Sequence, residues 1–504
     1  MAESPLKRLL VQASHYSAAS LLATVSGLIS FPLLTRIFSV ADYGVMNLVS
    51  VTLAVTVALG KVGLQHSIIR YQTEIRSGKG KFTAAQVHAT ALIGMSVTGL
   101  GATLILVAGA RWVPTSWLGD SRLRQLFTIA GLVVLIQVVE SALLNFLRAD
   151  QETSLFMKYQ VAKKYLGLAL ILFAVFVVSK TLTAFYSALL VSEALAVAWL
   201  ALLFIRRDDS PPFSPRDFSR PLYLELLGFG IPMMIGYEMS GIVLATGDRY
   251  VIHGTIGATQ LGLYSAAYNL CQYVQSIFIA SVGQAVMPLY LQMWDQKGVE
   301  ETTAFIGRSL RTYILFGAPV IAGVAVVGPE LLRSLAGNRY ASAAVILPWV
   351  IAGMVVDGAN SMLAAGLFIH RKTRHIMVVV LTSAALNLLL NLILVPRIGI
   401  MGAAIATLVS YVLASFALAL AGRRLLPIKI PWATILRAGL ASFAMYALLT
   451  RLVPGRHALT VGVRCLVGAP VYLLLVAAID LDARALLVQA RGRLWRWLFT
   501  PQSP

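Results

Sequence analysis

The chain has 504 residues, of which 58% are hydrophobic and 12% charged, and it carries a formal net charge of +20. With a mean hydropathy of +0.79, this composition excludes a soluble globular protein and predicts a membrane protein. The basic residues are distributed according to the side of the membrane on which each loop is predicted to lie, and they form no single patch. We therefore expect no nucleic-acid partner.

Apolar segments of roughly 20 residues, the length of a helix that crosses a hydrocarbon core of about 30 Å, recur along the whole chain. They predict an all-α polytopic protein with about fourteen transmembrane helices. The first is too long for a signal-peptide core and no small-residue cleavage site follows it, so we expect it to remain. In chain order we place the spans near residues 14–36, 43–69, 84–110, 125–147, 159–179, 183–205, 222–247, 258–290, 309–328, 342–369, 376–395, 400–421, 433–450 and 459–479.

Lysine and arginine concentrate in alternate loops of this topology. With the N-terminus in the cytoplasm, the cytoplasmic segments hold 28 of the 41 basic residues. By the positive-inside rule, both termini are expected to be cytoplasmic. The tail QARGRLWRWLF, residues 489–499, mixes arginine with tryptophan and predicts a basic amphipathic helix at the inner leaflet.

The linker RRDDSPPFSPRDFSRP, residues 206–221, is rich in proline and charge and predicts a cytoplasmic connection that divides the chain. Before it we expect an N-terminal lobe of six helices at 1–205. After it we expect a C-terminal lobe of six helices at 222–421. Two further helices and the basic tail occupy 422–504.

The two halves share short sequences. Gly27 and Arg36 recur as Gly241 and Arg249, and ALLVS at 188–192 recurs as ATLVS at 406–410. These nearly equal offsets favour an internal six-helix repeat, hence two pseudo-symmetric lobes around a central cavity. Chance recurrence of short apolar words is the alternative.

Motifs typical of enzymes are missing. The sequence has no H-E-x-x-H, the run SGKGKF at 77–82 is no phosphate loop, and the seven histidines lack ligand spacing. Asp480 and Asp482 form a D-x-D pair, but the basic tail that follows favours a solvated helix end over a metal-sugar site. The predicted outer loops are short, which disfavours a membrane glycosyltransferase or polymerase. We therefore expect no catalytic residue, no structural metal and a function located between the helices.

Charged residues within predicted spans include Lys61, Glu140, Glu193, Glu238 and Asp357. Because hydrocarbon penalises a charge by several kcal/mol, we expect each to face a cavity. For Glu193 and Glu238, a partner inside a lobe is an equal alternative. For Lys61 the cavity is favoured, because no acid lies within four residues on its own helix.

Arg308 and Arg311 are spaced i, i+3 at the start of the predicted ninth helix, and Arg70 ends the second helix on the same side. The commoner role of such residues is to anchor a helix end at lipid phosphates. As a set lining a wet cleft, they suit a phosphate or pyrophosphate group. The predicted substrate-binding residues of the cavity are Lys61, Arg70, Glu140, Arg308 and Arg311.

Four segments in order resemble the polysaccharide transporter family of Wzx-type lipid-linked oligosaccharide flippases, within the multidrug/oligosaccharidyl-lipid/polysaccharide exporter superfamily. They are PLLTRIFSVADYG at 32–44, VGLQHSIIRY at 62–71, GDRYVIHGTIGATQLGLYSAAYNL at 247–270 and NLLLNLILVPRIGIMGAAIATLVSYV at 387–412. The resemblance, over about residues 10–420, implies two six-helix lobes around a cavity that opens alternately to each side. The implied function is to flip an undecaprenyl-pyrophosphate-linked repeat unit from the cytoplasmic to the periplasmic leaflet of the bacterial inner membrane.

In relatives that flip the peptidoglycan precursor, the first helix carries cavity arginines, which HYSAASLLATVSGLIS lacks. The absence of these arginines favours, as the substrate, a glycan of O-antigen, exopolysaccharide or capsule. Some relatives hold sodium between four helical residues, and the matching residues here are Asp248, Asn387, Asn391 and Thr407. They predict a cation-coupling site, with interhelical hydrogen bonding as the alternative. We expect no other cofactor, and Na⁺ or H⁺ as the coupling ion.

The partners implied are a lipid-linked oligosaccharide and membrane lipids, with a polysaccharide polymerase and chain-length proteins as further candidates. Three alternatives remain open. One is a multidrug/cation antiporter of the same superfamily, which the excess of basic over acidic residues disfavours. The others are an integral-membrane glycosyltransferase or polymerase, and a scaffold for other envelope enzymes.

Overall fold

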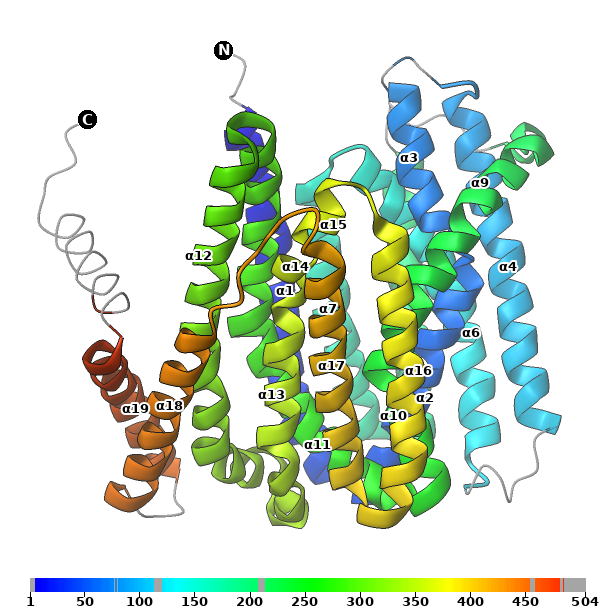
Figure 1. Cartoon of the computed structure of the whole chain (residues 1–504). Helices are drawn as coiled ribbons and strands as arrows, with labels where there is room; N and C mark the ends of the chain where they lie inside the picture. The colour runs from blue at the N-terminus through cyan, green and yellow to red at the C-terminus, as the bar shows by residue number, and fades with distance from the viewer. Residues whose placement is uncertain are drawn as a thin grey trace, which may run out of the picture. The chain divides into compact units, whose positions relative to one another are not determined.

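The structure is a computed structural model that describes residues 5–76, 78, 80–112, 120–206, 214–453, 458–480 and 484. In this part of the chain all regular structure is helical (Figure 1). Twelve helices are long and apolar enough to cross a membrane, and Arg220–Gly236 with Ser240–Ile256, bent by 47°, forms a thirteenth candidate span. The prediction of an all-α, multi-pass membrane protein is confirmed. The predicted count of fourteen exceeds the number found in the described residues by one or two.

The helices follow one another with few breaks. In chain order they are α1 Pro5–Ile37, α2 Val40–Lys61, α3 Leu64–Arg76, α4 Ala84–Trp112, α6 Leu123–Ala149, α7 Thr153–Phe173, α8 Leu182–Ile205, α9 Arg220–Met233, α10 Ser240–Ile256, α11 Ala258–Val274, α12 Ala280–Ala336, α13 Leu347–Gly358, α14 Asn360–Leu363, α15 Ala365–Ile369, α16 Thr373–Ile398, α17 Ile400–Gly422, α18 Trp432–Leu452 and α19 Ala458–Ile479. The predicted eighth and ninth spans fall on α11, a π-turn at Gln275–Ile279 and α12, in which Gly298 interrupts the helix with φ 77°.

The chain forms two compact units. Unit 1 comprises Met1–Ser265 and Val380–Ala403, and unit 2 comprises Ala266–Val379 and Ala404–Pro504. The predicted lobes, their boundary at 206–221 and the internal repeat stay predictions. The predicted amphipathic helix at 489–499 lies outside the described residues.

In unit 1, α6 packs against α2, α3, α4 and α8, while α7 packs against α1 and α8. A helix surrounded in this way must be apolar on most of its faces. The sequence of α6 meets this requirement, since Val133, Val134, Val138 and Phe146 are all 0% exposed. Glu140 is a buried exception on the same helix and is described below.

The predicted second span, 43–69, is broken. Helix α2 ends at Lys61 because Val62 and Gly63 adopt left-handed backbone conformations, with φ 49° and 74°. Gly63 also lies against the backbone of α9, where an added Cβ would be 1.9 Å from the Gly230 carbonyl oxygen. Glycine at position 63 therefore permits both the break and the packing of α3 against α9.

We expect Gly63→Ala to lower the thermal unfolding temperature of the purified protein markedly. Left-handed strain alone costs about 1–3 kcal/mol for a residue with a Cβ, and the contact with Gly230 adds a steric clash. Gly399→Ala is the control, because Gly399 also has a positive φ, of 64°, just after a helix but has open space around its Cβ position. Equal losses in the two variants would contradict a role for the close helix contact.

In unit 2, α18 and α19 pack against α12 and against each other (Figure 1). The side chains between them form a buried apolar cluster, and the Tyr472 hydroxyl donates a hydrogen bond of 2.8 Å to the Leu315 carbonyl. The cluster consists of Leu315, Ala322, Val326, Ala438, Ala441, Met445, Leu449, Tyr472 and Val476.

Asp480 ends this helix pair, and the expectation of a solvated helix end is wrong for it. The residue is 0% exposed, and its carboxylate lies 2.8 Å from Arg311 Nη2 and 3.4 Å from Arg437 Nη1. Two arginines from α12 and α18 thus offset the cost of burying this charge. Asp482 lies outside the described residues.

Candidate functional site

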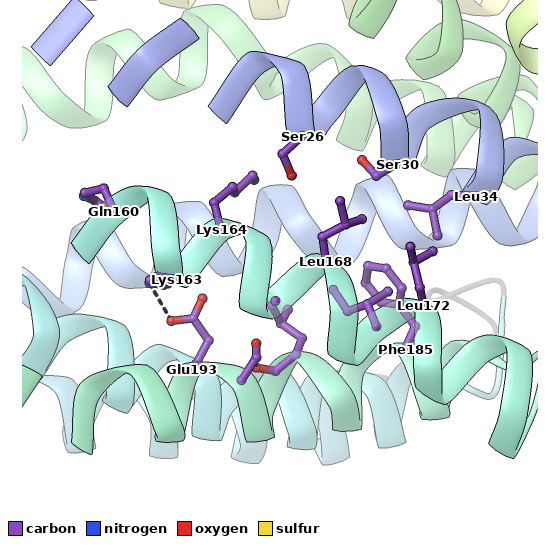
Figure 2. Close-up of a pocket in the computed structure, with 14 residues that line it drawn as sticks. Ser26, Ser30, Leu34, Gln160, Lys163, Lys164, Leu168, Leu172, Phe185 and Glu193 are labelled. Atoms are coloured by element: carbon purple, nitrogen blue, oxygen red, sulfur yellow. Dashed lines mark hydrogen bonds and ion pairs between the residues drawn. The ribbon is translucent and has the colours of Figure 1, made fainter. Parts of the chain in front are cut away.

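A pocket of about 400 Å³ opens within unit 1 between α1, α7 and α8. Each helix contributes residues spaced three, four or seven apart, which lie on one helical face. Figure 2 shows Ser26 pointing from α1 toward α7, and Lys164 pointing from α7 toward α1. The polar lining consists of Ser26, Ser30, Gln160, Lys163, Lys164, Ser192 and Glu193.

Lys163 lies at the centre of a buried ionic network. Its Nζ is 2.6 Å from Glu140 Oε2 and 2.6 Å from Glu193 Oε2, so the amine joins α6, α7 and α8. The Tyr159 hydroxyl donates 2.8 Å to the other oxygen of Glu140, and Gln137 Nε2 donates 3.1 Å to Glu193. All four oxygens of the two carboxylates therefore have a polar contact, as charges within the membrane require.

Lys164 differs from its neighbour. It lines the pocket and is exposed there, and its amine forms no ion pair with a carboxylate among the described residues of unit 1. Two carboxylates and two lysines leave the group neutral, with Lys163 enclosed between the acids and Lys164 open to a ligand. An ammonium opposite serine hydroxyls can donate hydrogen bonds to an anion or to sugar hydroxyls.

The sequence identified Glu140 and Glu193 but missed Tyr159, Lys163 and Lys164 as their neighbours. These three residues occur together in YQVAKKY, residues 159–165, at the start of the predicted fifth span. By the positive-inside rule, basic residues at this end of the span indicate only the orientation of the chain. The available signal was the i, i+4 spacing of Tyr159 and Lys163, which places them on one face of a helix.

Of the predicted substrate-binding residues, Lys61, Arg70 and Glu140 lie in unit 1. Lys61 does have an acidic partner, but from outside its own helix, because its Nζ is 3.6 Å from Glu238 Oε1. Gln65 also donates to Glu238. Arg70 Nε donates 3.0 Å to Glu74, and its guanidinium lies 4.9 Å from the centre of the Phe229 ring.

Arg308 and Arg311 lie on α12 in unit 2. Arg308 is exposed, whereas Arg311 is half-buried and paired with Asp480. The proposal that the five predicted residues line one cavity stays a prediction.

The predicted cation-coupling residues are also divided, with Thr407 in unit 2 and the other three in unit 1. Asp248 is 2% exposed, and its two carboxylate oxygens are engaged by Arg249, at 3.1 Å, and by the Tyr264 hydroxyl. An ion would have to displace one of these partners, so Asp248 fits a cation poorly as arranged.

The two asparagines fit a cation better. Asn391 Nδ2 donates 3.1 Å to Asn387 Oδ1, while Asn391 Oδ1 is buried without a hydrogen bond among the described residues. That oxygen is available as a ligand, and the hydroxyl of Thr407 is likewise buried and unbonded in the described part of unit 2. The four-residue site stays a prediction. The described residues contain no group of three His, Cys, Asp or Glu side chains arranged for a metal ion.

Comparison with known proteins places these features in context. The model of a family described as polysaccharide biosynthesis protein matches residues 33–345. Membrane protein MJ1068 of Methanocaldococcus jannaschii, which is uncharacterized, is 26% identical over 198 residues, covering 38% of each chain. The probable low-salt glycan biosynthesis flippase Agl15 of Haloferax volcanii is 22% identical over 164 residues, 32% of this chain and 34% of Agl15. The chain thus matches between a third and two fifths of the length of these relatives.

Solved structures share the fold. The lipid II flippase MurJ, in an inward closed conformation, superposes with a TM-score of 0.72 at 16% identity over 93% of this chain and 99% of MurJ. An inward-facing multidrug resistance transporter of the MATE family, in the MOP superfamily, superposes with a TM-score of 0.57 at 15% identity. That match covers 82% of this chain and 94% of the transporter.

Proposed function

The chain belongs to the polysaccharide biosynthesis protein family, and we propose that it is a transporter that flips a lipid-linked oligosaccharide across the membrane, rather than an enzyme. The observation that carries the proposal is a polar pocket held among membrane-spanning helices in a member of this family. The name of the relative Agl15 and the fold shared with MurJ support it.

In the proposed form, the substrate is an undecaprenyl-pyrophosphate-linked repeat unit of O-antigen, exopolysaccharide or capsule. It moves from the cytoplasmic to the periplasmic leaflet of a bacterial inner membrane, with both termini of the protein in the cytoplasm. The family resemblance and the distribution of basic residues support this orientation.

The anionic head group would be held by cationic side chains, for which Lys164, Lys61, Arg70 and Arg308 are the candidates. Arg311 is not included, because its partner Asp480 is fully buried, whereas the acids paired with Lys61 and Arg70 are partly exposed. With the cell interior negative, an anionic head is driven outward by about 2.3 kcal/mol per charge per 100 mV, so the step needs no ATP. Na⁺ or H⁺ would reset the transporter.

The shared fold also includes multidrug exporters, which would need a site for organic cations. Among the charged side chains that line the pocket, Lys164 is the one without an ion pair in the described residues, and its ammonium can donate hydrogen bonds to a phosphate. A glycan carrier with a phosphate head group is therefore the better substrate class.

We expect Lys61→Ala and Arg308→Ala each to reduce glycan export while leaving membrane insertion intact. Each variant removes a cation assigned to the head group, and a lost charge-assisted hydrogen bond is worth about 1.5–3 kcal/mol, or roughly tenfold or more in binding. Export is measured as surface polysaccharide in a strain that lacks the gene and is complemented with each variant.

Lys297→Ala is the control, because Lys297 is an exposed residue of α12 whose pair with Glu301 contributes little. Normal surface polysaccharide in both Lys61→Ala and Arg308→Ala would remove these residues from the binding set.

A further inference from the structure

Asp357 occupies an unusual position in unit 2. It lies in the last turn of α13, within the candidate span Asn338–Leu363, and the helix breaks two residues later at Ala359 before α14 begins. The break frees the backbone carbonyl of Val355, because the Ala359 amide donates to Val356 instead. The Tyr313 hydroxyl of α12 donates a hydrogen bond of 2.6 Å to the freed Val355 carbonyl.

The buried acids of the described chain are all paired with a cation, whereas Asp357 is only partly buried. Their distances to the nearest basic nitrogen are 2.6 Å for Glu140 and Glu193, 2.8 Å for Asp480, 2.9 Å for Glu330 and 3.1 Å for Asp248. Asp357 has no such partner among the described contacts of unit 2. Its one polar contact there is with a neutral amide, since Asn360 Nδ2 donates 3.0 Å to Asp357 Oδ1.

Three features of this position oppose a negative charge on Asp357. It lies within a membrane-spanning segment, where an unpaired carboxylate is strongly disfavoured. It lies at the C-terminal end of a helix, where the helix dipole is negative. It lacks the lysine or arginine that stabilises each of the buried acids.

The surrounding groups favour a proton over a metal ion. The Asn360 amide presents its NH₂ group to Asp357, and its own oxygen accepts a 2.6 Å hydrogen bond from Ser415. One carboxylate oxygen is thus left for a ligand, far fewer than the six or more oxygens that a hard cation such as calcium collects. The neighbouring helices add the titratable hydroxyl of Tyr313, which is committed to Val355, and the neutral Asn360 and Ser415.

We propose that Asp357 is a proton-binding site of this protein, at the break between α13 and α14. The carboxyl group holds a proton while its surroundings are dry, and releases it when water reaches the break. Because Asn360 links the carboxyl group to Ser415 of α17, the proton state of Asp357 acts directly on the contact between α13, α14 and α17.

Infrared difference spectroscopy of the purified full-length protein in liposomes tests the site without any glycan. We expect a carbonyl band of a protonated carboxylic acid that titrates between acid and alkaline buffers, and we expect Asp357→Asn to remove it. Asp357→Glu should retain a shifted band, which keeps the test decisive if the asparagine variant folds poorly. Glu330→Gln is the control, because Glu330 also lies in a candidate span but is paired with Arg333, so its loss should leave the band unchanged.

A band that persists in Asp357→Asn, or a wild-type protein with no titrating band, would overturn the proposal. The titration is run in potassium and in sodium buffers, with the same midpoint expected. Loss of the band on adding sodium at constant pH would identify a cation site instead. Since no glycan enters the measurement, failure here leaves the proposed transport function untouched.

Discussion

Replacing Lys163 with methionine is expected to destabilise the protein by about 3–5 kcal/mol, the usual cost of removing one partner from a buried ion pair. The side chains of Glu140 and Glu193 are 5% and 7% exposed, and both would lose the amine that neutralises them. The loss is measured as a fall in the thermal unfolding temperature of the detergent-solubilised protein. Further replacement by Glu140→Gln and Glu193→Gln should restore most of the stability, because no buried charge remains.

Lys164→Met is the matched comparison, one residue further along α7. Lys164 is exposed to the pocket and has no acidic partner among the described contacts, so the change in stability should stay within about 0.5 kcal/mol. Glycan export should nevertheless fall about tenfold or more, as expected when one charge-assisted hydrogen bond to a ligand is lost. Normal export with normal stability would show that the pocket does not bind the head group. Equal destabilisation by the two variants would contradict the distinct roles assigned to the two lysines.

The fold was largely accessible from the sequence because hydropathy and helix length set where a chain can cross a membrane. The break after Lys61 was missed for a tertiary reason. Apolar residues continue beyond it, and the left-handed backbone that ends the helix at Val62 and Gly63 goes with the approach of Gly63 to the backbone at Gly230, 167 positions later. No local pattern encodes such a contact.

The site was accessible only in part. The rule that a charge in a span faces a cavity or finds a partner singles out Glu140 and Glu193, but it does not say which partner each will find. That choice depends on how α6, α7 and α8 are rotated about their axes. The sequence alone therefore does not place Lys163 between the two acids, where the structure has it. The prediction of a solvated helix end at Asp480 was wrong for the same reason, because its partner Arg311 is 169 residues away in the sequence.

Asp480→Asn is expected to loosen the α18–α19 pair from α12. The substitution leaves Arg311 and Arg437 facing each other across a neutral amide, at a cost of about 3 kcal/mol. We take the low end of the range for breaking a buried pair because the side chain of Arg437 is 43% exposed. The effect is measured as a lower unfolding temperature and as faster proteolytic cleavage between α17 and α18. Glu330→Gln, which breaks a pair within α12 alone, should leave that cleavage unchanged.

The double variant Arg311→Gln with Asp480→Asn decides between two roles for Arg311. If Arg311 serves to dock the helix pair, two neutral side chains that can hydrogen-bond to each other should recover most of the stability, and export should recover with it. If Arg311 instead binds the anionic head group, the double variant should be stable but still unable to export. The 2.8 Å contact with a fully buried carboxylate favours docking, because an arginine neutralised in this way has little charge left to offer a substrate. A stable, inactive double variant would return Arg311 to the substrate-binding set.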